Sequence, residues 1–115
     1  MVTQPKAYVP EKGDVVWINL DPQAGHEQSG RRPAIILSSL AYNEKIGLAV
    51  LCPITSRAKG YPFEVVIPPG LVVSGVVLSD QVKSVDWKAR NAVFICQIPD
   101  STKLEVVRLV YSLLQ

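Results

Sequence analysis

Histidine and cysteine are scarce in this 115-residue sequence, which contains one histidine and two cysteines. Cys52 and Cys96 each lie inside an apolar run, in neither a CxxC nor a Cys/His arrangement. A structural zinc site needs more ligands than these, so we expect no metal site. The cysteines are instead expected to be buried, reduced thiols, which fits a protein of the reducing cytoplasm.

Long apolar segments are also missing. No run approaches the roughly 18 apolar residues that a membrane-spanning helix needs, and residues 1–12 lack the apolar core of a signal peptide. We therefore expect no membrane association. The length suits a single domain over residues 1–115, and its 48% of hydrophobic residues can fill one modest core. Pro5, Pro10 and mixed charges predict that residues 1–12 are an irregular lead-in.

A strong excess of either charge is the third absence. The formal net charge is +2 at pH 7. This value permits an anionic partner, but it is far from the dense positive charge of a non-specific nucleic-acid clamp. Net charge therefore decides nothing about function, and particular residues must do so.

The sequence does contain a series of short runs that favour β-strands. They are rich in β-branched and aliphatic residues and are separated by Gly, Pro and polar turns, at residues 14–20, 33–37, 47–52, 63–67, 72–79, 82–85 and 92–98. Residues 39–45 break the apolar pattern, and Pro53 is expected to end the third strand. Many short strands followed by one helix predict a mainly β fold, a small and strongly bent barrel with a C-terminal helix.

The C-terminal helix is expected to begin at residues 99–101, with Thr102 and Glu105 forming a capping box. One stripe of this helix is polar, and most of its remaining surface is apolar. So wide an apolar surface predicts burial on two sides, against the barrel and against a second subunit.

The polar loop between the first two strands combines groups that a solvated connector rarely holds together. Gly25 and Gly30 allow the backbone to turn and to approach a ligand closely. The loop also brings a proton acceptor, several hydrogen-bonding groups and two permanent cations into a short stretch: His26, Glu27, Gln28, Ser29, Arg31 and Arg32. We expect the chemistry of the protein at this loop.

Two further segments are candidates for ligand contact. Arg57, Lys59 and Tyr61 form a basic and aromatic turn suited to phosphate contact and base stacking, although such a run more commonly forms a solvated turn. Asp80 and Gln81 interrupt a long apolar ribbon, and a polar pair at a strand bend is a candidate site.

Six motifs follow one another in an order that resembles one protein family. They are GDVVW with LDP, GHEQSGRRPAIILS, CPITS, KGYPFEV, GVVLSDQVKSVDW and the C-terminal helix. From near Gly13 to its end, the chain resembles the MazF/PemK/Kid family of bacterial toxins. This resemblance implies an SH3-like barrel of the MazF/CcdB/Kid type that forms a homodimer. It further implies a sequence-selective endoribonuclease that cleaves single-stranded RNA, messenger RNA above all, with neither metal nor cofactor. A cognate acidic, MazE-like antitoxin would inhibit it.

Metal-independent RNA cleavage places three demands on the site. It needs a base for the proton of the ribose 2′-OH, a cation or donor for the charge that grows on phosphorus, and an acid for the departing 5′-oxygen. Glu27 is the candidate base, and Arg32 is the candidate phosphate clamp because its planar fork can bind two oxygens. The alternative is that Glu27 and Arg32 only pair across a surface loop. His26 could act as acid or as base, or it could simply bond a backbone carbonyl.

The resemblance assigns further roles. Thr55, which follows Cys-Pro-Ile, would donate its hydroxyl to the cleaved phosphate, whereas the alternative is a strand threonine satisfied by nearby backbone. Leu78 stands where one branch of the family carries an arginine, so charge stabilisation should fall on Arg32, helped by Arg31. The expected products are a 2′,3′-cyclic phosphate and a 5′-OH.

The residues expected to contact RNA come from the loop, the basic turn and the pair at the strand bend. They are Gln28, Arg31, Ser56, Arg57, Lys59, Asp80 and Gln81. A second class of function stays open, a non-catalytic barrel that binds nucleic acid or poisons a protein target such as DNA gyrase. The loop favours the endoribonuclease, because a carboxylate beside a histidine contributes nothing to phosphate binding unless it transfers protons.

Overall fold

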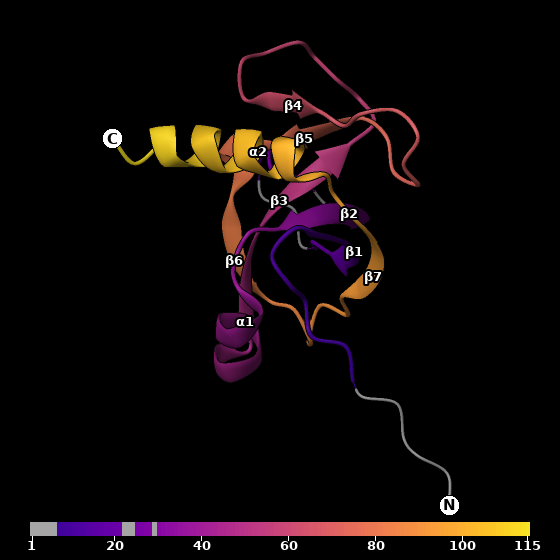
Figure 1. The fold of residues 1–115 in the computed structure, drawn as a ribbon, viewed down its shortest axis with the longest axis vertical. Helices are drawn as coiled ribbons and strands as arrows, with labels where there is room; N and C mark the ends of the chain where they lie inside the picture. Colours follow the sequence, from indigo (N-terminus) through magenta and orange to yellow (C-terminus); the bar gives the residue numbers. More distant parts are fainter. Residues whose placement is uncertain (1–6, 22–24, 29) are drawn as a thin grey trace, which may run out of the picture.

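The computed structural model describes residues 7–21, 25–28 and 30–115 (Figure 1). Residues 1–6 of the expected lead-in, and Ser29 of the polar loop, lie outside this described part. Within it, no helix has the length and apolar character needed to cross a membrane.

An antiparallel hairpin opens the fold. Its strands are β1 (Asp14–Asn19) and β2 (Arg31–Ile36), and their register places Ile18 opposite Arg32. The polar loop connects them. Both strands were expected from their apolar sequences, although β2 begins at Arg31, so both arginines of the loop belong to the strand.

Five more strands complete a curved, antiparallel sheet of seven strands. They are β3 (Leu48–Thr55), β4 (Glu64–Val66), β5 (Val76–Leu78), β6 (Lys83–Asp86) and β7 (Val93–Gln97). The hydrogen-bonded order is β4-β5-β3-β2-β1-β7, and β6 pairs with β3 beside this path. In the described part of the chain this order has two ends, so the sheet bends without closing. The predicted mainly β fold with a C-terminal helix is confirmed.

The curvature gives the sheet two buried faces. Val15 belongs to one hydrophobic cluster and Val16 to another, although they are neighbours in β1 and their side chains leave opposite faces. This explains why the strands read as continuous apolar runs instead of alternating ones. Cys52 lies in the first cluster, and Cys96 is only partly buried; both are free thiols.

Strand β3 lies at the centre of the sheet and corrects the expectation for Pro53. The strand continues through this proline to Thr55, and Pro53 itself pairs with Ala34 of β2. On its other side, β3 pairs with β6 up to Leu51 and with β5 from Ile54. Pro53 therefore lies where β3 changes partner, which is the place where a missing N–H is tolerated best.

Residues 39–45 are not merely a break, because they hold helix α1 (Leu40–Ile46). Ser39 caps its first turn by accepting from the backbone N–H of Tyr42, and Gly47 ends it in the left-handed conformation. Only Asn43 of this helix is buried. The apolar pattern of the strands is thus interrupted as expected, but the helix itself was missed, since none of its apolar side chains is buried.

The C-terminal helix α2 (Asp100–Ser112) begins after Pro99, and no side chain caps its N-terminus. The predicted capping box is wrong: Thr102 is buried, and Glu105 instead accepts a hydrogen bond of 2.8 Å from Arg108. Pro99 instead fixes φ at the entry to the helix.

One face of α2 packs on the first hydrophobic cluster. Val106 is fully buried there, and Leu109 and Val110 are partly buried. Leu104 and Tyr111 remain 63% and 62% exposed. Burial against the barrel is thus confirmed, whereas burial on a second side stays a prediction.

Candidate functional site

Two candidate catalytic residues lie at matching positions on adjacent strands. The register between β2 and β3 pairs Ala34 with Pro53, and extending it by two residues brings Arg32 opposite Thr55. Arg32 is half-buried on β2 and Thr55 is 5% exposed at the end of β3. Both line the same cavity. Sheet pairing thus fixes these two side chains next to each other, as the assigned roles require.

Gly75 holds the end of β3 close to the neighbouring turn. It has a φ of +111°, and a Cβ atom built on it would lie 2.1 Å from the carbonyl oxygen of Thr55. Only glycine permits this approach. The backbone next to Thr55 is therefore packed too tightly to shift freely.

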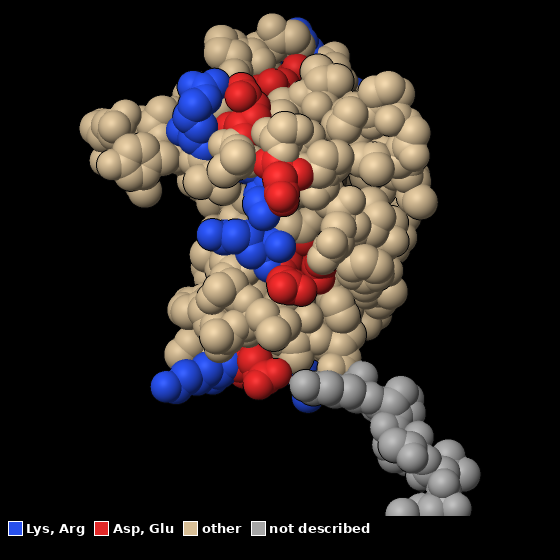
Figure 2. All heavy atoms as spheres, viewed as in Figure 1, with Lys and Arg blue, Asp and Glu red and all other residues tan. Residues whose placement is uncertain are grey.

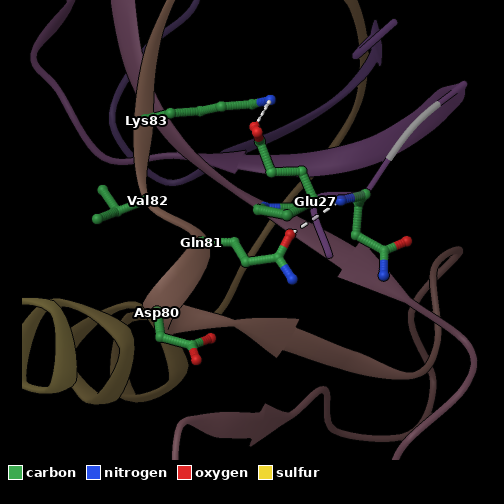
Figure 3. Close-up of a pocket in the computed structure, with 7 residues that line it drawn as sticks. Glu27, Asp80, Gln81, Val82 and Lys83 are labelled. Atoms are coloured by element: carbon green, nitrogen blue, oxygen red, sulfur yellow. Dashed lines mark hydrogen bonds and ion pairs between the residues drawn. The ribbon is translucent and has the colours of Figure 1, made fainter. Parts of the chain in front are cut away.

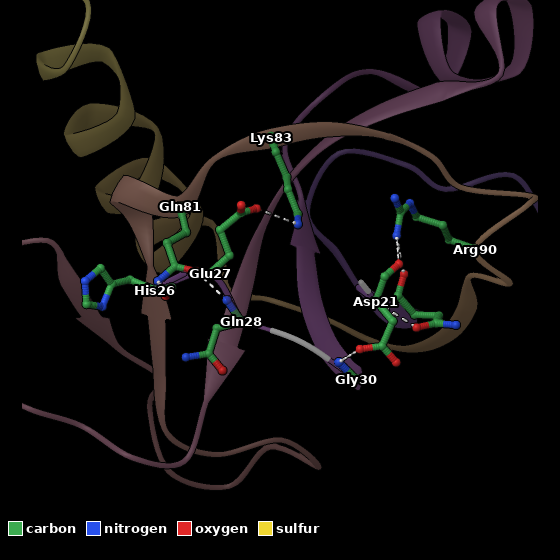
Figure 4. A network of polar contacts seen from close by, with 9 residues as sticks. Asp21, His26, Glu27, Gln28, Gly30, Gln81, Lys83 and Arg90 are labelled. Atoms are coloured by element: carbon green, nitrogen blue, oxygen red, sulfur yellow. Dashed lines mark hydrogen bonds and ion pairs between the residues drawn. The ribbon is translucent and has the colours of Figure 1, made fainter. Parts of the chain in front are cut away.

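The described part of the polar loop lies against the 80–83 segment, which comprises Asp80, Gln81, Val82 and Lys83 (Figure 3). The Gln81 side chain makes two hydrogen bonds to the loop backbone. Its Oε1 accepts from the N–H of Gln28 at 3.0 Å, and its Nε2 donates to the carbonyl of His26 at 3.3 Å. Gln81 was expected to contact RNA, but here its amide groups hold the loop (Figure 4).

Glu27 forms an ion pair with Lys83, in which Nζ lies 3.5 Å from Oε2. The two side chains are 50% and 27% exposed, respectively, so water screens the attraction and the pair contributes little stability. Its main effect is on the orientation of the carboxylate (Figure 3). Lys83 was missed in the sequence, because its contact with Glu27 joins residues 56 positions apart and no local pattern marks it.

The basic turn forms the opposite side of the site. The backbone N–H groups of Lys59 and Gly60 donate to the Glu64 carboxylate at 2.9 and 2.7 Å, which ties the turn to the start of β4. Thr55 Oγ1 accepts from the N–H of Arg57 at 3.2 Å. This bond leaves the Thr55 hydroxyl hydrogen available as a donor.

Tyr61 and Asp80 are joined by a hydrogen bond of 2.6 Å from the phenol to Oδ1. Burial and this bond to a carboxylate raise the pKa of Tyr61 above its usual value. The phenol therefore stays protonated and continues to donate at neutral pH.

Two adjoining cavities form one groove, because they share five lining residues. The larger, of about 370 Å³, adds Gly25, Glu27 and Arg32, and the smaller adds Tyr61, Leu78, Asp80 and Gln81. The shared residues are His26, Gln28, Thr55, Arg57 and Lys59. We call this feature the groove. It brings together all four predicted catalytic residues and five of the seven predicted RNA-contact residues.

Arg31 and Ser56 do not line the groove. Arg31 neighbours Arg32 on β2, so its side chain leaves the opposite face of the strand, and it donates to the carbonyl of Asn91 at 3.0 Å. Ser56 is exposed beside Thr55. Among the residues that the structure describes, no group of three or more His, Cys, Asp or Glu side chains could hold a metal ion.

Charge on the face shown in Figure 2 is mixed. Lys and Arg alternate with Asp and Glu in a band down the molecule, and a broad uncharged area lies to the right of this band. This face therefore presents no field of one sign to a nucleic acid.

The family described as "PemK-like, MazF-like toxin of type II toxin-antitoxin system" matches residues 11–114. The chain belongs to this family. Its relatives include the endoribonuclease toxin MazF of Escherichia coli K12, which is 52% identical over 85 residues, or 74% of this chain and 76% of that protein. The resemblance inferred from the motifs is therefore confirmed.

Solved structures of the same family share the fold. MazF from Deinococcus radiodurans is 55% identical and superimposes with a TM-score of 0.91, covering 94% of this chain and 98% of that one. A MazE–MazF structure from the same organism is also 55% identical, with a TM-score of 0.85 and coverage of 94% and 97%.

Proposed function

We propose that this family member is the toxin of a toxin–antitoxin pair and that it cleaves single-stranded RNA, messenger RNA above all, in the groove. The observation that carries the proposal is the convergence of Arg32 and Thr55 on adjacent strands with His26 and Glu27 on the loop. Relatives named as endoribonucleases support the same activity.

The proposed reaction is an internal transfer at phosphorus. Glu27 takes the proton of the ribose 2′-OH, the 2′-oxygen forms a bond to phosphorus, and the bond from phosphorus to the 5′-oxygen breaks. His26 gives a proton to the departing 5′-oxygen. Arg32 and the Thr55 hydroxyl bind the non-bridging oxygens, whose charge grows in the transition state. The products are a 2′,3′-cyclic phosphate and a 5′-OH.

The test is to incubate the purified chain with labelled single-stranded RNA in the presence of a chelator. Cleavage should persist and give the cyclic phosphate, and deoxyribose on the 5′ side of the cut should block it. A 3′-OH with a 5′-phosphate, or a strict requirement for magnesium, would exclude this mechanism. RNA binding without any cleavage would favour the non-catalytic module instead.

We further propose that the toxin acts as a cytoplasmic homodimer. Large apolar side chains remain exposed on β1, β7 and α2, among them Trp17, Phe94 and Leu104 at 43%, 46% and 63%. Covering such side chains favours self-association. Light scattering should give a dimer for the parent chain, and a monomeric mass at all accessible concentrations would contradict the proposal.

The proposed inhibitor is an acidic antitoxin with an extended segment. Arg57 and Lys59 are exposed along the groove and offer partners for its carboxylates. The MazE–MazF structure supports the pairing of such a toxin with an antitoxin. Titrating the antitoxin should inhibit cleavage in competition with RNA, and higher salt should slow its association. Inhibition without competition would exclude this mode of control.

A further inference from the structure

The turn between β6 and β7, residues 87–91, carries an arginine that the proposed reaction does not use. Arg90 is only partly exposed, and it lines neither cavity of the groove. Its Nη1 donates to two backbone carbonyls, that of Asp21 at 2.7 Å and that of Asn19 at 3.2 Å. Both acceptors lie where β1 passes into the polar loop. Arg90 therefore binds the entry to the loop that carries the proposed acid and base.

Local hydrogen bonds fix the conformation of this turn. The N–H of Ala89 donates to Asp86 Oδ1 at 2.8 Å, and the N–H of Arg90 donates to the Asp86 carbonyl at 3.0 Å. Asn91 follows with a φ of +56°, a left-handed conformation that asparagine adopts more readily than most residues. The Arg90 carbonyl in turn accepts from the N–H of Asn19 at 3.0 Å. Because the backbone of Arg90 is already attached to its target, its side chain loses little freedom when it binds there.

The same turn holds the strand that leaves the polar loop. Arg31, at the start of β2, donates from Nη2 to the carbonyl of Asn91 at 3.0 Å. We call residues 19–21 and 30–31 the stem of the loop. The turn thus contacts both sides of the stem, and in both contacts an arginine donates to a backbone carbonyl.

Hydrogen bonds continue from Arg90 through the stem towards the described part of the loop (Figure 4). Asp21 offers its carbonyl to Arg90, and its Oδ1 accepts from the N–H of Gly30 at 2.8 Å. Gly30 is two residues from Gln28, whose N–H donates to Gln81 at 3.0 Å. The loop is therefore held at two places, at its stem by the 87–91 turn and near Gln28 by Gln81.

We propose that Arg90 is a positioning residue, which sets the path of the stem and thereby presents His26 and Glu27 to the groove. The proposal rests on the RNA-cleaving function proposed above. Placement of the reacting groups affects the rate of the chemical step, and RNA affinity is set by other contacts. The competing role for an arginine near an RNA-binding groove is contact with a phosphate, which would affect affinity first.

Arg90→Met tests the proposal, because it removes both donors and the charge but keeps an unbranched side chain. The two lost hydrogen bonds come from a charged group and are exposed to water, so single-turnover cleavage should fall by about 10-fold. The dissociation constant for RNA should change less than about twofold. Its dependence on salt should match that of the parent, whereas loss of a phosphate contact would reduce the slope of log K against log salt concentration by about 0.7.

Two milder variants separate hydrogen bonding from charge. Arg90→Gln keeps an NH₂ donor without a charge, and Arg90→Lys keeps the charge on a compact donor. A positioning role predicts that both restore part of the cleavage rate and that neither changes RNA affinity. A phosphate contact instead predicts that lysine restores affinity and glutamine does not. Lys88→Met is the matched control: it removes an exposed cation of the same turn that lies outside both cavities of the groove, and it should leave cleavage unchanged.

Amide hydrogen exchange of Gly30 measures the hold on the stem without RNA. In Arg90→Met this exchange should quicken by about 10-fold, and in Arg90→Gln by less. Thermal unfolding of each variant identifies a general loss of structure, in which case the milder variants decide.

The outcomes separate this inference from the proposed function. If the parent cleaves RNA and Arg90→Met cleaves at the same rate, or binds RNA more weakly with a lower salt slope, the positioning role is wrong and the nuclease stands. If the parent does not cleave RNA, the proposed function fails, and Gly30 exchange decides the rest. Quicker exchange in Arg90→Met would then support the hold of Arg90 on the stem, and exchange at the parental rate would overturn it.

Discussion

Replacing Gln81 with methionine should slow cleavage by releasing the polar loop. Methionine matches glutamine in length but loses both hydrogen bonds, the 3.0 Å bond from the N–H of Gln28 and the 3.3 Å bond to the carbonyl of His26. Neutral hydrogen bonds contribute about 0.5–1.5 kcal/mol each. Both hydrogen bonds are at least partly exposed, so we take their combined contribution as about 1–2 kcal/mol. Losing it reduces the fraction of molecules whose loop is attached to residue 81 by about 5- to 30-fold.

The assay combines single-turnover cleavage, RNA affinity and amide hydrogen exchange. Cleavage should fall by about the same factor, about 5- to 30-fold, since His26 and Glu27 act only when the loop is in place. Exchange of the Gln28 amide should quicken by a similar factor, and the dissociation constant for RNA should change less than about twofold. Gln81→Glu is the companion variant: it keeps an acceptor for Gln28, but it turns a charged oxygen towards the carbonyl of His26, so its defect should be at least as large as that of methionine.

One result would refute this reasoning and restore the role expected from the sequence. If Gln81→Met weakens RNA binding while Gln28 exchanges at the parental rate, Gln81 contacts RNA and does not hold the loop. If neither the cleavage rate nor the exchange of the Gln28 amide changes, the two hydrogen bonds do not stabilise the loop. Thermal unfolding of each variant excludes a general loss of structure.

Three further predictions concern the strands and the core. Arg32→Ala should cost a few kcal/mol of barrier, a loss of the order of 10² or more in cleavage rate, with unchanged folding, and His26→Ala should cost less; equal rates for Arg32→Ala and the parent would exclude Arg32 as the charge stabiliser. Gly75→Ala should lower the unfolding free energy by about 2–4 kcal/mol in urea, because its Cβ would meet the Thr55 carbonyl at 2.1 Å, whereas Gly70→Ala, also at positive φ but in open space, should cost less. Burial raises the pKa of the Cys52 thiol from 9.0 to about 12, so folding favours its protonated form, and stability should fall between pH 9 and 12 by up to about 1.4 kcal/mol per pH unit. Replacing Cys52 with alanine should reduce that pH dependence, and an unchanged slope would contradict the assignment.

Much of the fold could be predicted because both faces of the central strands are buried. Continuous apolar runs such as that of β3 mark strands covered on two sides, and Gly and Pro mark their ends. The prediction that Pro53 ends β3 was wrong, because the cost of its missing N–H depends on which neighbouring strand that group would face. That is a property of the sheet order, and no local pattern encodes it. Helix α1 was missed because its signals are a serine cap and a terminal glycine, not an apolar stripe.

The candidate site, like the fold, could be predicted only in part from the sequence. Residue types identified His26, Glu27 and Arg32 as groups able to perform the chemistry, and the family resemblance added Thr55. Their convergence depends on the pairing of β2 with β3, which sequence spacing does not determine. The hydrogen bonds that attach the loop to Gln81 and Lys83 link residues more than 50 positions apart in the sequence. Such contacts follow from the folded topology, so the role of Gln81 and the presence of Lys83 could not be derived beforehand.

The attachment of the polar loop to a distant segment bears on how the family can diversify. Arg32 and Thr55 belong to paired strands of the sheet, so the sheet and not the loop sets their positions. Residues 25–28 lie on the surface and are held by Gln81 and Lys83. A chimera that takes this loop from a relative would therefore inherit its working shape only if residues 80–83 were transplanted with it. The two segments should therefore change together in evolution, and the strands of the barrel need not change with them.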